Sequence, residues 1–303
     1  MPKRREPGMT GKNTLNRREA LKVAALTALS LPLIGVPSVT AAETNSSVKK
    51  AGRAPALKLG VASYSLAKLP VEGVIEVLKQ VEITGVSLYK SHAPWADGTP
   101  DECKAVVQKF SDAGIMVTST GMIELPNDEA VVRKALDNVR AAGLTTFCGW
   151  LKQTDSLPLV DKLVKEYDLK VAIHNHGPTQ ELATGMDVWK AVQPYDRRIG
   201  LCLDVAHGFR AGENPARTIR QCRERLYEVH LRDTMATGGG MKDPQPAVVG
   251  HGLLDFRSII AALLEVKYSC QAEFEYEKKE DNRVPGLAES VGYVRGMLAG
   301  MAA

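Results

Sequence analysis

The chain of 303 residues has only five cysteines, and no two of them form a C-x-x-C pair. Their number is odd, and three of the five lie within apolar stretches of strand length, which disfavours a disulfide framework. We therefore expect buried free thiols that pack as small hydrophobic side chains. A disulfide framework remains the alternative interpretation.

A long uninterrupted apolar run is also missing. The uncharged segment 23–40 contains two prolines and a glycine, which disfavours a permanent membrane-spanning helix. It follows the pair Arg17-Arg18 and leads into small residues, the pattern of a cleavable twin-arginine signal peptide. We therefore predict that residues 1–42 are a twin-arginine signal peptide and that the mature protein is periplasmic or secreted, with no permanent membrane anchor. A disordered basic tail is the alternative.

The apparent positive charge of the chain belongs to this segment. Residues 1–42 contain seven Lys and Arg residues against two Glu residues, so the whole-chain net charge of +4 leaves −1 for residues 43–303. A near-neutral mature protein lacks the basic footprint that binds nucleic acid. We therefore expect no nucleic-acid partner.

The mature part shows neither hairpin signals nor a glycine-rich phosphate-binding turn after its first strand. Short apolar stretches instead alternate with longer stretches of helical spacing. The predicted strands are 57–63, 85–90, 115–120, 145–150, 169–175, 199–204, 226–231 and 270–276. The predicted helices are 71–82, 100–113, 127–142, 157–167, 185–192, 215–223, 255–266 and 287–298. Asn127 and Asn214 are expected to cap two of these helices, and residues after 204 to form a glycine-bounded loop.

Eight repeated β/α units favour a closed parallel sheet, and the 261 mature residues are close to the usual size of such a barrel. We predict an α/β protein with a single (β/α)8 TIM barrel at 56–303, preceded by the cleavable signal segment and a linker at 43–55. An open doubly wound sheet is the alternative, but it usually has the glycine turn that is missing here.

All six histidines lie at the end of a predicted strand or after it, where the reactive groups of a barrel gather. They are His92, His174, His176, His207, His230 and His251. Carboxylates join them: Asp204 ends the sixth strand, and Glu273, Glu275 and Glu277 alternate through the eighth and share one side of it. A glutamate that points into a barrel is unfavourable unless it binds a positive group. Asp204, His230 and Glu275 are therefore candidates for a shared divalent cation such as Mn²⁺, Zn²⁺, Co²⁺ or Mg²⁺.

Structural roles compete with these functional ones. His251 is expected to be exposed, Asp233 to order the loop that follows it, and Glu277 to belong to a solvated charged run at 277–281. His207 could bind a loop carbonyl, and Tyr64 and Trp150 could be packing residues.

The chain from Leu57 onward resembles the xylose-isomerase-like barrels of the sugar phosphate isomerase/epimerase superfamily. The resemblance rests on motifs that follow one another in order. They are L-G-V-A-S-Y-S-L at 59, V-A-I-H-N-H-G at 171, G-L-C-L-D-V-A-H-G at 200, Y-E-V-H-L-R-D at 227, V-V-G-H-G-L-L-D-F at 248 and E-F-E-Y-E at 273. The resemblance implies one divalent metal ion, held by Asp204, His230 and Glu275 together with His174. Many relatives have glutamate at the position of His174, so this site has one negative charge fewer.

The resemblance also implies a small-molecule carbohydrate substrate. In this family the metal stabilises the enediolate that forms when a base removes a proton next to a carbonyl. His176 and Lys90 are the candidate bases, while His92, His207, Tyr64 and Trp150 are candidates for substrate binding. We expect a sugar isomerase or epimerase; the alternative is a lyase or dehydratase on a keto-sugar, such as a 3-keto-glycoside or an inosose.

Two other classes share this barrel. Metal-dependent endonucleases need a basic face, which the mature charge disfavours, and a non-catalytic sugar-binding protein would not need the complete ligand set. The sequence gives no indication of the oligomeric state.

Overall fold

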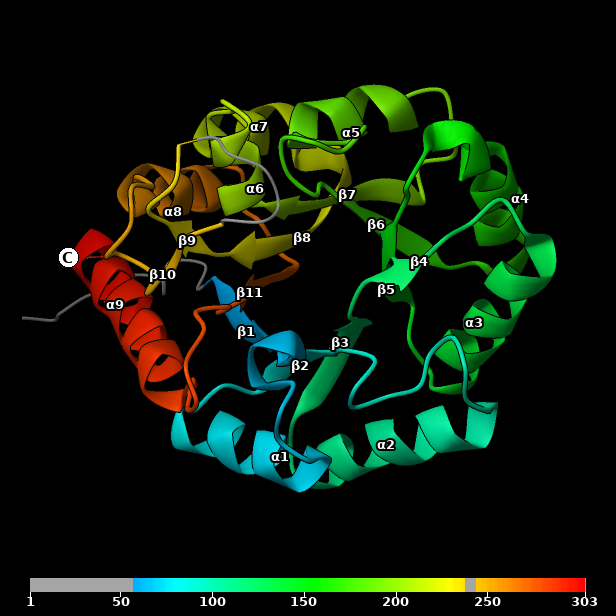
Figure 1. Cartoon of the computed structure of the whole chain (residues 1–303), viewed down its shortest axis with the longest axis horizontal. Coiled ribbons are helices and arrows are strands. Elements are labelled where there is room, and N and C mark those ends of the chain that lie inside the picture. Colours follow the sequence, from blue (N-terminus) through cyan, green and yellow to red (C-terminus); the bar gives the residue numbers. More distant parts are fainter. Residues whose placement is uncertain (1–56, 238–243, 303) are drawn as a thin grey trace, which may run out of the picture. The chain divides into compact units, whose positions relative to one another are not determined.

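Nine strands form one parallel sheet that curls into a nearly closed barrel, with helices outside it (Figure 1). The structure, a computed structural model, describes residues 57–237 and 244–302, so the predicted signal peptide and the linker lie outside the described residues. The strands follow the order β3-β2-β1-β11-β8-β7-β6-β5-β4 around the sheet. They are β1 (Lys58–Ala62), β2 (Gly85–Leu88), β3 (Met116–Thr120), β4 (Ile123–Glu124), β5 (Thr146–Trp150), β6 (Lys170–His174), β7 (Ile199–Asp204), β8 (Leu226–Leu231) and β11 (Gln271–Phe274).

Eight of these strands correspond to the eight predicted ones, with β3 in the place of the predicted third strand at 115–120, whereas the two-residue strand β4 lies beyond that prediction. β3 pairs with β2, and β4, which begins three residues later, pairs with β5. The chain bends at Gly121, where a Cβ atom would lie 2.7 Å from the Cα atom of Tyr89, so only glycine permits this close approach. The predicted α/β barrel is therefore present, with its third strand divided between its two neighbours.

The helices lie around the outside of the barrel and cover the strands (Figure 1). In the described part of the chain they are α1 (Val71–Gln80), α2 (Pro100–Asp112), α3 (Glu129–Ala141), α4 (Leu157–Tyr167), α5 (Gly185–Val192), α6 (Val205–Arg210), α7 (Pro215–Cys222), α8 (Phe256–Glu265) and α9 (Val284–Ala302). Short 3₁₀ turns are η1 (Ser63–Leu66), η2 (Thr154–Ser156) and η3 (Arg223–Arg225). Among the described residues, no helix has both the length and the apolarity needed to cross a membrane.

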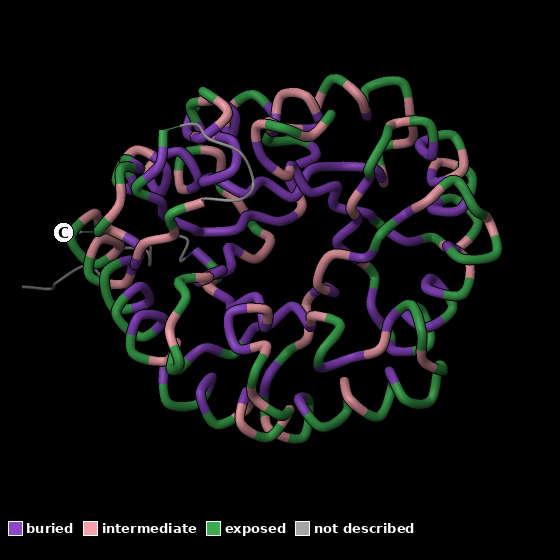
Figure 2. The backbone as a smooth tube through the Cα atoms, in the orientation of Figure 1, coloured by how far each residue is buried: buried purple, intermediate pink, exposed green. Residues whose placement is uncertain are grey.

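Side chains along each strand alternate between the helix-covered face and the barrel interior. On β7, Ile199, Leu201 and Leu203 belong to the main hydrophobic core between strands and helices, whereas Cys202 lies in a separate small cluster with Cys148 and Ala172. The strands are buried and the outward faces of the helices are exposed (Figure 2). The barrel interior thus holds small and polar side chains rather than the branched apolar layers that usually fill it.

All five cysteines are free thiols, and four of them are buried, which confirms the expectation that they pack as small side chains. The predicted cap at Asn214 is also confirmed, because its side chain accepts a hydrogen bond from the backbone N–H of Arg217. The cap predicted at Asn127 is wrong. Asp128 occupies that position and accepts hydrogen bonds from the N–H groups of Ala130 and Val131.

Two elements near the carboxyl end of the barrel differ from the sequence prediction. The loop expected after residue 204 contains the short helix α6, which Asp204 caps by accepting a 2.7 Å hydrogen bond from the N–H of His207. The segment after β8 forms a small antiparallel pair, β9 (Asp233–Thr234) with β10 (Pro246–Ala247). Each begins close to the end of a barrel strand, because α6 follows β7 directly and β9 begins two residues after β8.

Candidate active site

A cavity of about 390 Å³ opens at the carboxyl end of the barrel. Its wall includes the end of β1, the loop after β6, helix α6 and the segment after β11. The side chains that concern the chemistry are Tyr64, His176, His207, His230, Arg232, Glu275 and Glu277. The cavity is thus placed where the parallel strands end, as in other barrels of this kind.

Four buried side chains, from β6, β7 and β8 and from the residue just after β11, converge beside this cavity. His230 and Glu275 belong to its lining, whereas His174 and Asp204 do not. One ligand atom each from His174, Asp204, His230 and Glu275 lies within 4.8 Å of the other three. His230 Nδ1 is 3.2 Å from both His174 Nε2 and Glu275 Oε2, and Asp204 Oδ2 is 3.9 Å from His174 Nε2. We call these four residues the four-donor cluster. Two imidazole nitrogens and two carboxylate oxygens at such distances suit a divalent cation.

The adjacency of β6, β7, β8 and β11 in the sheet explains the convergence. β8 pairs with β7 on one side and β11 on the other, and Asp204 lies opposite His230 in the register. Successive side chains of a strand point to opposite faces, so residues two positions apart share a face. The side chains at these positions lie on the face that points into the barrel. Asp204 is fully buried, and the His174 and His230 side chains are only 1% and 4% exposed.

A second layer of polar groups orients His230 from below. Its Nε2 lies 3.2 Å from Glu228 Oε1, which leaves Nδ1 facing the four-donor cluster. The other oxygen of Glu228 accepts a 2.9 Å hydrogen bond from Ser119 Oγ. Burial alone would lower the pKa of His230, but the carboxylates of Glu275 and Glu228 outweigh burial and raise it well above its usual range. Carboxylate partners of this kind commonly fix the orientation of a metal-binding histidine.

Arg232 brings a positive charge to the edge of the cluster. Its Nη1 is 3.3 Å from Asp204 Oδ2 and 3.8 Å from Glu275 Oε2, and its Nη2 pairs with Glu277. Although burial opposes ionisation, His207 and Arg232 hold the pKa of Asp204 below its usual range. Asp204 therefore remains charged, and Arg232 lies close enough to both carboxylates of the cluster to offset part of their mutual repulsion.

Neutral histidines surround the cavity above the cluster. Burial lowers the pKa of His207 to about 3, and its Nε2 lies 3.1 Å from Arg232 Nη1, so it accepts that hydrogen bond as an uncharged ring. Burial also lowers the pKa of His176, whose Nδ1 is buried and has no hydrogen-bond partner among the described residues. His176 thus contributes an uncharged ring to the wall of the cavity.

The residues suggested from the sequence separate into two groups. His174, Asp204, His230 and Glu275 come together, and His176, His207 and Tyr64 line the cavity beside them. Lys90, the other candidate base, is exposed with its Nζ 5.8 Å from the centre of the Tyr89 ring, outside the described lining of the cavity.

His92 and Trp150 also lie outside that lining. His92 is buried between Ser63 Oγ, at 2.9 Å, and the carbonyl oxygen of Leu69, at 3.1 Å. Trp150 lies behind His176, with ring centres 5.5 Å apart, so it supports this histidine rather than facing the cavity.

Three residues of the site, Glu228, Arg232 and Glu277, had no functional assignment from the sequence. Glu228 and Arg232 each lie two residues from His230, on β8 or just beyond it, so this spacing was the available signal. The interpretation of Glu277 as part of a solvated run is wrong, because its side chain is only 19% exposed and pairs with Arg232.

Two expectations about neighbouring loops are confirmed. His251 is 60% exposed, and Asp233 accepts hydrogen bonds from the N–H groups of Gly250, Gly252 and Leu254. Asp233 thus orders the loop after β10, and neither residue belongs to the cavity.

Residues 150–297 match the family model described as a xylose isomerase-like TIM barrel. The chain carries a xylose isomerase-like TIM barrel. The matched segment contains all four members of the four-donor cluster, together with His176 and Arg232. None of the curated proteins is significantly similar to the sequence.

Solved structures share this fold at low sequence identity. The IOLI protein with a bound zinc atom is 15% identical, with a TM-score of 0.67 over 80% of this chain and 99% of its own. The Escherichia coli 3-keto-D-glucoside 4-epimerase is 14% identical, with a TM-score of 0.63 over 80% of this chain and all of its own. The probable 3-DHS dehydratase of petrobactin synthesis from Bacillus anthracis is 12% identical, with a TM-score of 0.66 over 79% and 99%. At these identities the similarity establishes the fold.

Proposed function

We propose that the protein is a divalent-metal-dependent enzyme that moves a proton at the carbon next to a carbonyl group of a keto-sugar, as a sugar isomerase or epimerase does. The observation that carries the proposal is the four-donor cluster beside a cavity that can hold a sugar. The zinc atom of one structural neighbour and the 3-keto-glucoside substrate in the name of another support it.

His174, Asp204, His230 and Glu275 would hold the cation. Their fit rests on the donors themselves, because two buried carboxylates and two imidazoles converge while Glu228 turns Nδ1 of His230 toward them. When bound, a divalent cation supplies Lewis-acid polarisation of a carbonyl oxygen. Arg232 lies beside the same carboxylate oxygens and stabilises negative charge that develops on the substrate.

His176 is the base in this proposal. It lines the cavity, and burial lowers its pKa, so the ring is uncharged and can accept a proton. It takes the proton from the carbon next to the carbonyl; the C–H electron pair becomes a carbon–carbon double bond, and the carbonyl oxygen becomes negative. Return of a proton to the opposite face of the same carbon gives an epimer. Return to the former carbonyl carbon gives an isomer, while the proton of the adjacent hydroxyl passes to the former carbonyl oxygen. His207 and Tyr64 line the same cavity and bind hydroxyl groups of the substrate.

Deuterium exchange tests this proposal directly. The protein is incubated with keto-sugars in deuterated buffer, with and without a chelator, and deuterium at the carbon next to the carbonyl is measured by mass spectrometry. We expect incorporation that stops on chelation. His176→Gln should slow it about 10²–10⁴-fold, the usual contribution of a general base, while metal still binds. His251→Gln, a change at an exposed histidine outside the cavity, should leave it unchanged. Absence of exchange with every keto-sugar would contradict the proposal.

A second cavity favours an elimination reaction on a keto-glycoside as the alternative function. This cavity, of about 260 Å³, lies between η1 and the start of α9, and it shares Tyr64 and Arg283 with the first. A substrate with a second unit attached to its sugar ring fits two adjoining cavities. In this reaction the same proton is removed, but the electron pair expels the attached unit as a leaving group.

A keto-glycoside with a chromogenic leaving group distinguishes the two functions. Release of the chromophore indicates elimination, whereas deuterium incorporation with the chromophore retained indicates epimerisation. Leu69→Trp, a change in the second cavity only, should slow turnover of the glycoside and spare that of the free keto-sugar. Equal slowing of both substrates would contradict a role for the second cavity.

We also propose that the protein is exported to the periplasm or secreted. The support is the pattern of residues 1–42. Replacing Arg17 and Arg18 by lysines should keep the chain in the cytoplasmic fraction, as measured by cell fractionation, and an unchanged distribution would contradict twin-arginine export.

A further inference from the structure

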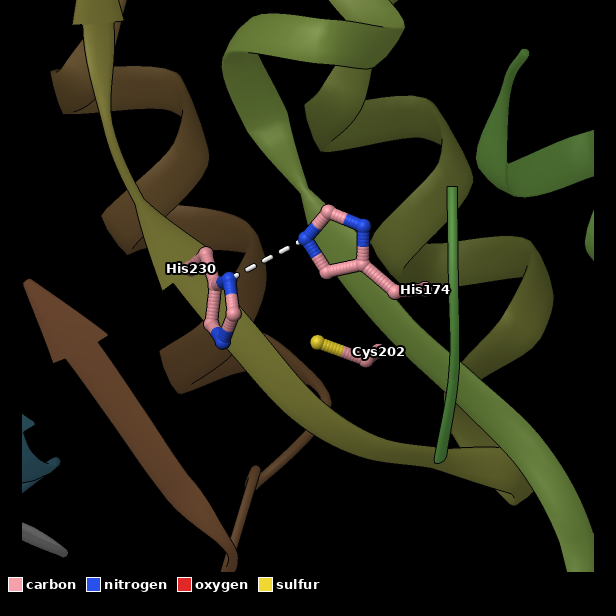
Figure 3. Close-up of side chains that lie close together, drawn as sticks. All are labelled: His174, Cys202 and His230. Atoms are coloured by element: carbon pink, nitrogen blue, oxygen red, sulfur yellow. Dashed lines mark hydrogen bonds between the residues drawn. The ribbon is translucent and has the colours of Figure 1, made fainter. Parts of the chain in front are cut away.

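A second group of metal-ligating atoms lies directly beneath the four-donor cluster. One ligand atom each from His174, Cys202 and His230 lies within 4.8 Å of the other two. Figure 3 shows the sulfur of Cys202 below the gap between the two imidazole rings. Two members of this group therefore belong also to the four-donor cluster, and Cys202 is the new one.

The alternation of β7 places Cys202 one level deeper in the barrel than Asp204. The two residues are two positions apart, so both side chains point inward. In the register, His174 lies opposite Cys202 on one side of β7, and His230 lies opposite Asp204 on the other. The two imidazoles thus have a carboxylate from β7 at one level and a thiol from the same strand at the next.

The thiol of Cys202 lies among small side chains. Cys202 is fully buried beside Cys148 and Ala172, and its thiol shares a hydrogen bond with the thiol of Cys148. A sulfur atom beside two imidazoles adds a soft ligand to the barrel interior. Sulfur and imidazole ligands favour softer cations, whereas carboxylate oxygens favour Mn²⁺ and Mg²⁺.

We propose that His174, Cys202 and His230 form a second, thiophilic ligand set that binds a soft cation of the Zn²⁺ or Cd²⁺ class. The proposal deepens the proposed function, because it rests on the same pair of imidazoles. Since both sets use His174 and His230, cations in the two sets compete. A soft cation at the deeper level withdraws the imidazoles from Asp204 and Glu275, so it inhibits the enzyme instead of supporting turnover.

Cadmium titration tests the thiophilic set. The full-length chain is freed of metal and titrated with Cd²⁺, and the ultraviolet charge-transfer band of a cadmium–thiolate bond is recorded. We expect this band in the unaltered chain, and we expect added Cd²⁺ to displace Mn²⁺. Cys202→Ala, which keeps a small apolar side chain next to Ala172, should lose the band. Cys222→Ala, a matched change at a buried cysteine on α7, should retain it.

Asp204→Asn separates the two ligand sets. This variant should bind Mn²⁺ poorly and still give the cadmium band, because Asp204 is absent from the deeper set. A band of full intensity in Cys202→Ala, or no band in the unaltered chain, would overturn the thiophilic set. Failure to bind Mn²⁺ or to exchange deuterium would instead contradict the proposed function. Circular dichroism checks that each variant is folded. If a variant does not fold, the cadmium titration of the unaltered chain still decides.

Discussion

Asp204 uses its two carboxylate oxygens for different tasks. Oδ1 accepts the hydrogen bond that begins α6, and Oδ2 faces His174 and Arg232 in the four-donor cluster. Asp204→Asn preserves an acceptor for the helix cap, since Asn and Asp cap helices about equally well, but it removes the charged ligand. We expect a folded protein with much less bound metal. Metal analysis and circular dichroism check this, and Asp255→Asn, a change at the cap of α8, is the control. Unchanged metal content would contradict the assignment of Asp204 as a ligand.

Glu228 acts on the cluster through His230. Glu228→Gln removes the negative charge beside Nε2 but keeps the size of the side chain and its contact with Ser119. Loss of such an outer partner typically weakens metal binding about 10–100-fold, and we expect a decrease in this range by direct titration. Glu224→Gln, a change in an exposed ion pair with Arg197, should have no effect. Equal affinity in both variants would show that Glu228 only fills the barrel.

Some of these residues could be found from the sequence and others could not. The sequence was sufficient to predict Asp204, His230 and Glu275, because strand ends and the two-residue alternation of side chains can be recognised from the local sequence pattern alone. Glu277 was misassigned because its neighbours 278–281 include several charged residues, and only the position of Arg232, just after β8, shows that it is buried. Lys90 ends a predicted strand, but β2 ends at Leu88 and leaves Lys90 in an exposed turn.

At the scale of elements, the close packing of β7 against β8 requires glycine at position 200. A Cβ atom there would lie 2.3 Å from the carbonyl oxygen of Arg225 and 2.4 Å from the ring of Tyr227. Because the backbone of Arg225 cannot yield easily, Gly200→Ala should lower the free energy of unfolding by about 1–3 kcal/mol in urea titrations. Gly292 lies on α9, where an added Cβ atom would meet no atom of the described residues within 4 Å. Gly292→Ala should therefore raise the free energy of unfolding by up to about 1 kcal/mol. A neutral Gly200→Ala would contradict this packing.

The elements themselves were largely predictable, since alternating apolar and amphipathic stretches define the β/α units. The departures arise where tertiary contacts decide. Gly121 bends the third strand because it approaches Tyr89, and α6 forms where glycines suggested a loop because Asp204 caps it. The pairing of β9 with β10 spans residues 234–246, a separation too long for a local turn signal.

At the scale of the whole molecule, the barrel interior contains several buried ionisable side chains. Burial and the neighbouring Glu228 raise the pKa of Glu273 to about 8, while Ser87 and Thr118 donate hydrogen bonds to its carboxylate. The four-donor cluster lies above this layer and adds two further carboxylates. Buried polar side chains are unfavourable unless they are paired, so a cation bound at the proposed site would increase the stability of the barrel.

Metal binding should therefore stabilise the entire fold. The four donors come from adjacent parts of the barrel wall, at β6, β7, β8 and just after β11, so a cation that binds only the folded chain links residues 174–275. At a free metal concentration of 100 times Kd, the free energy of unfolding should rise by about 2.7 kcal/mol. Urea unfolding with Mn²⁺ and with chelator measures the difference. Asp204→Asn should lose most of this gain, and Asp255→Asn should keep it. A gain of equal size in Asp204→Asn would place the stabilising cation elsewhere on the molecule.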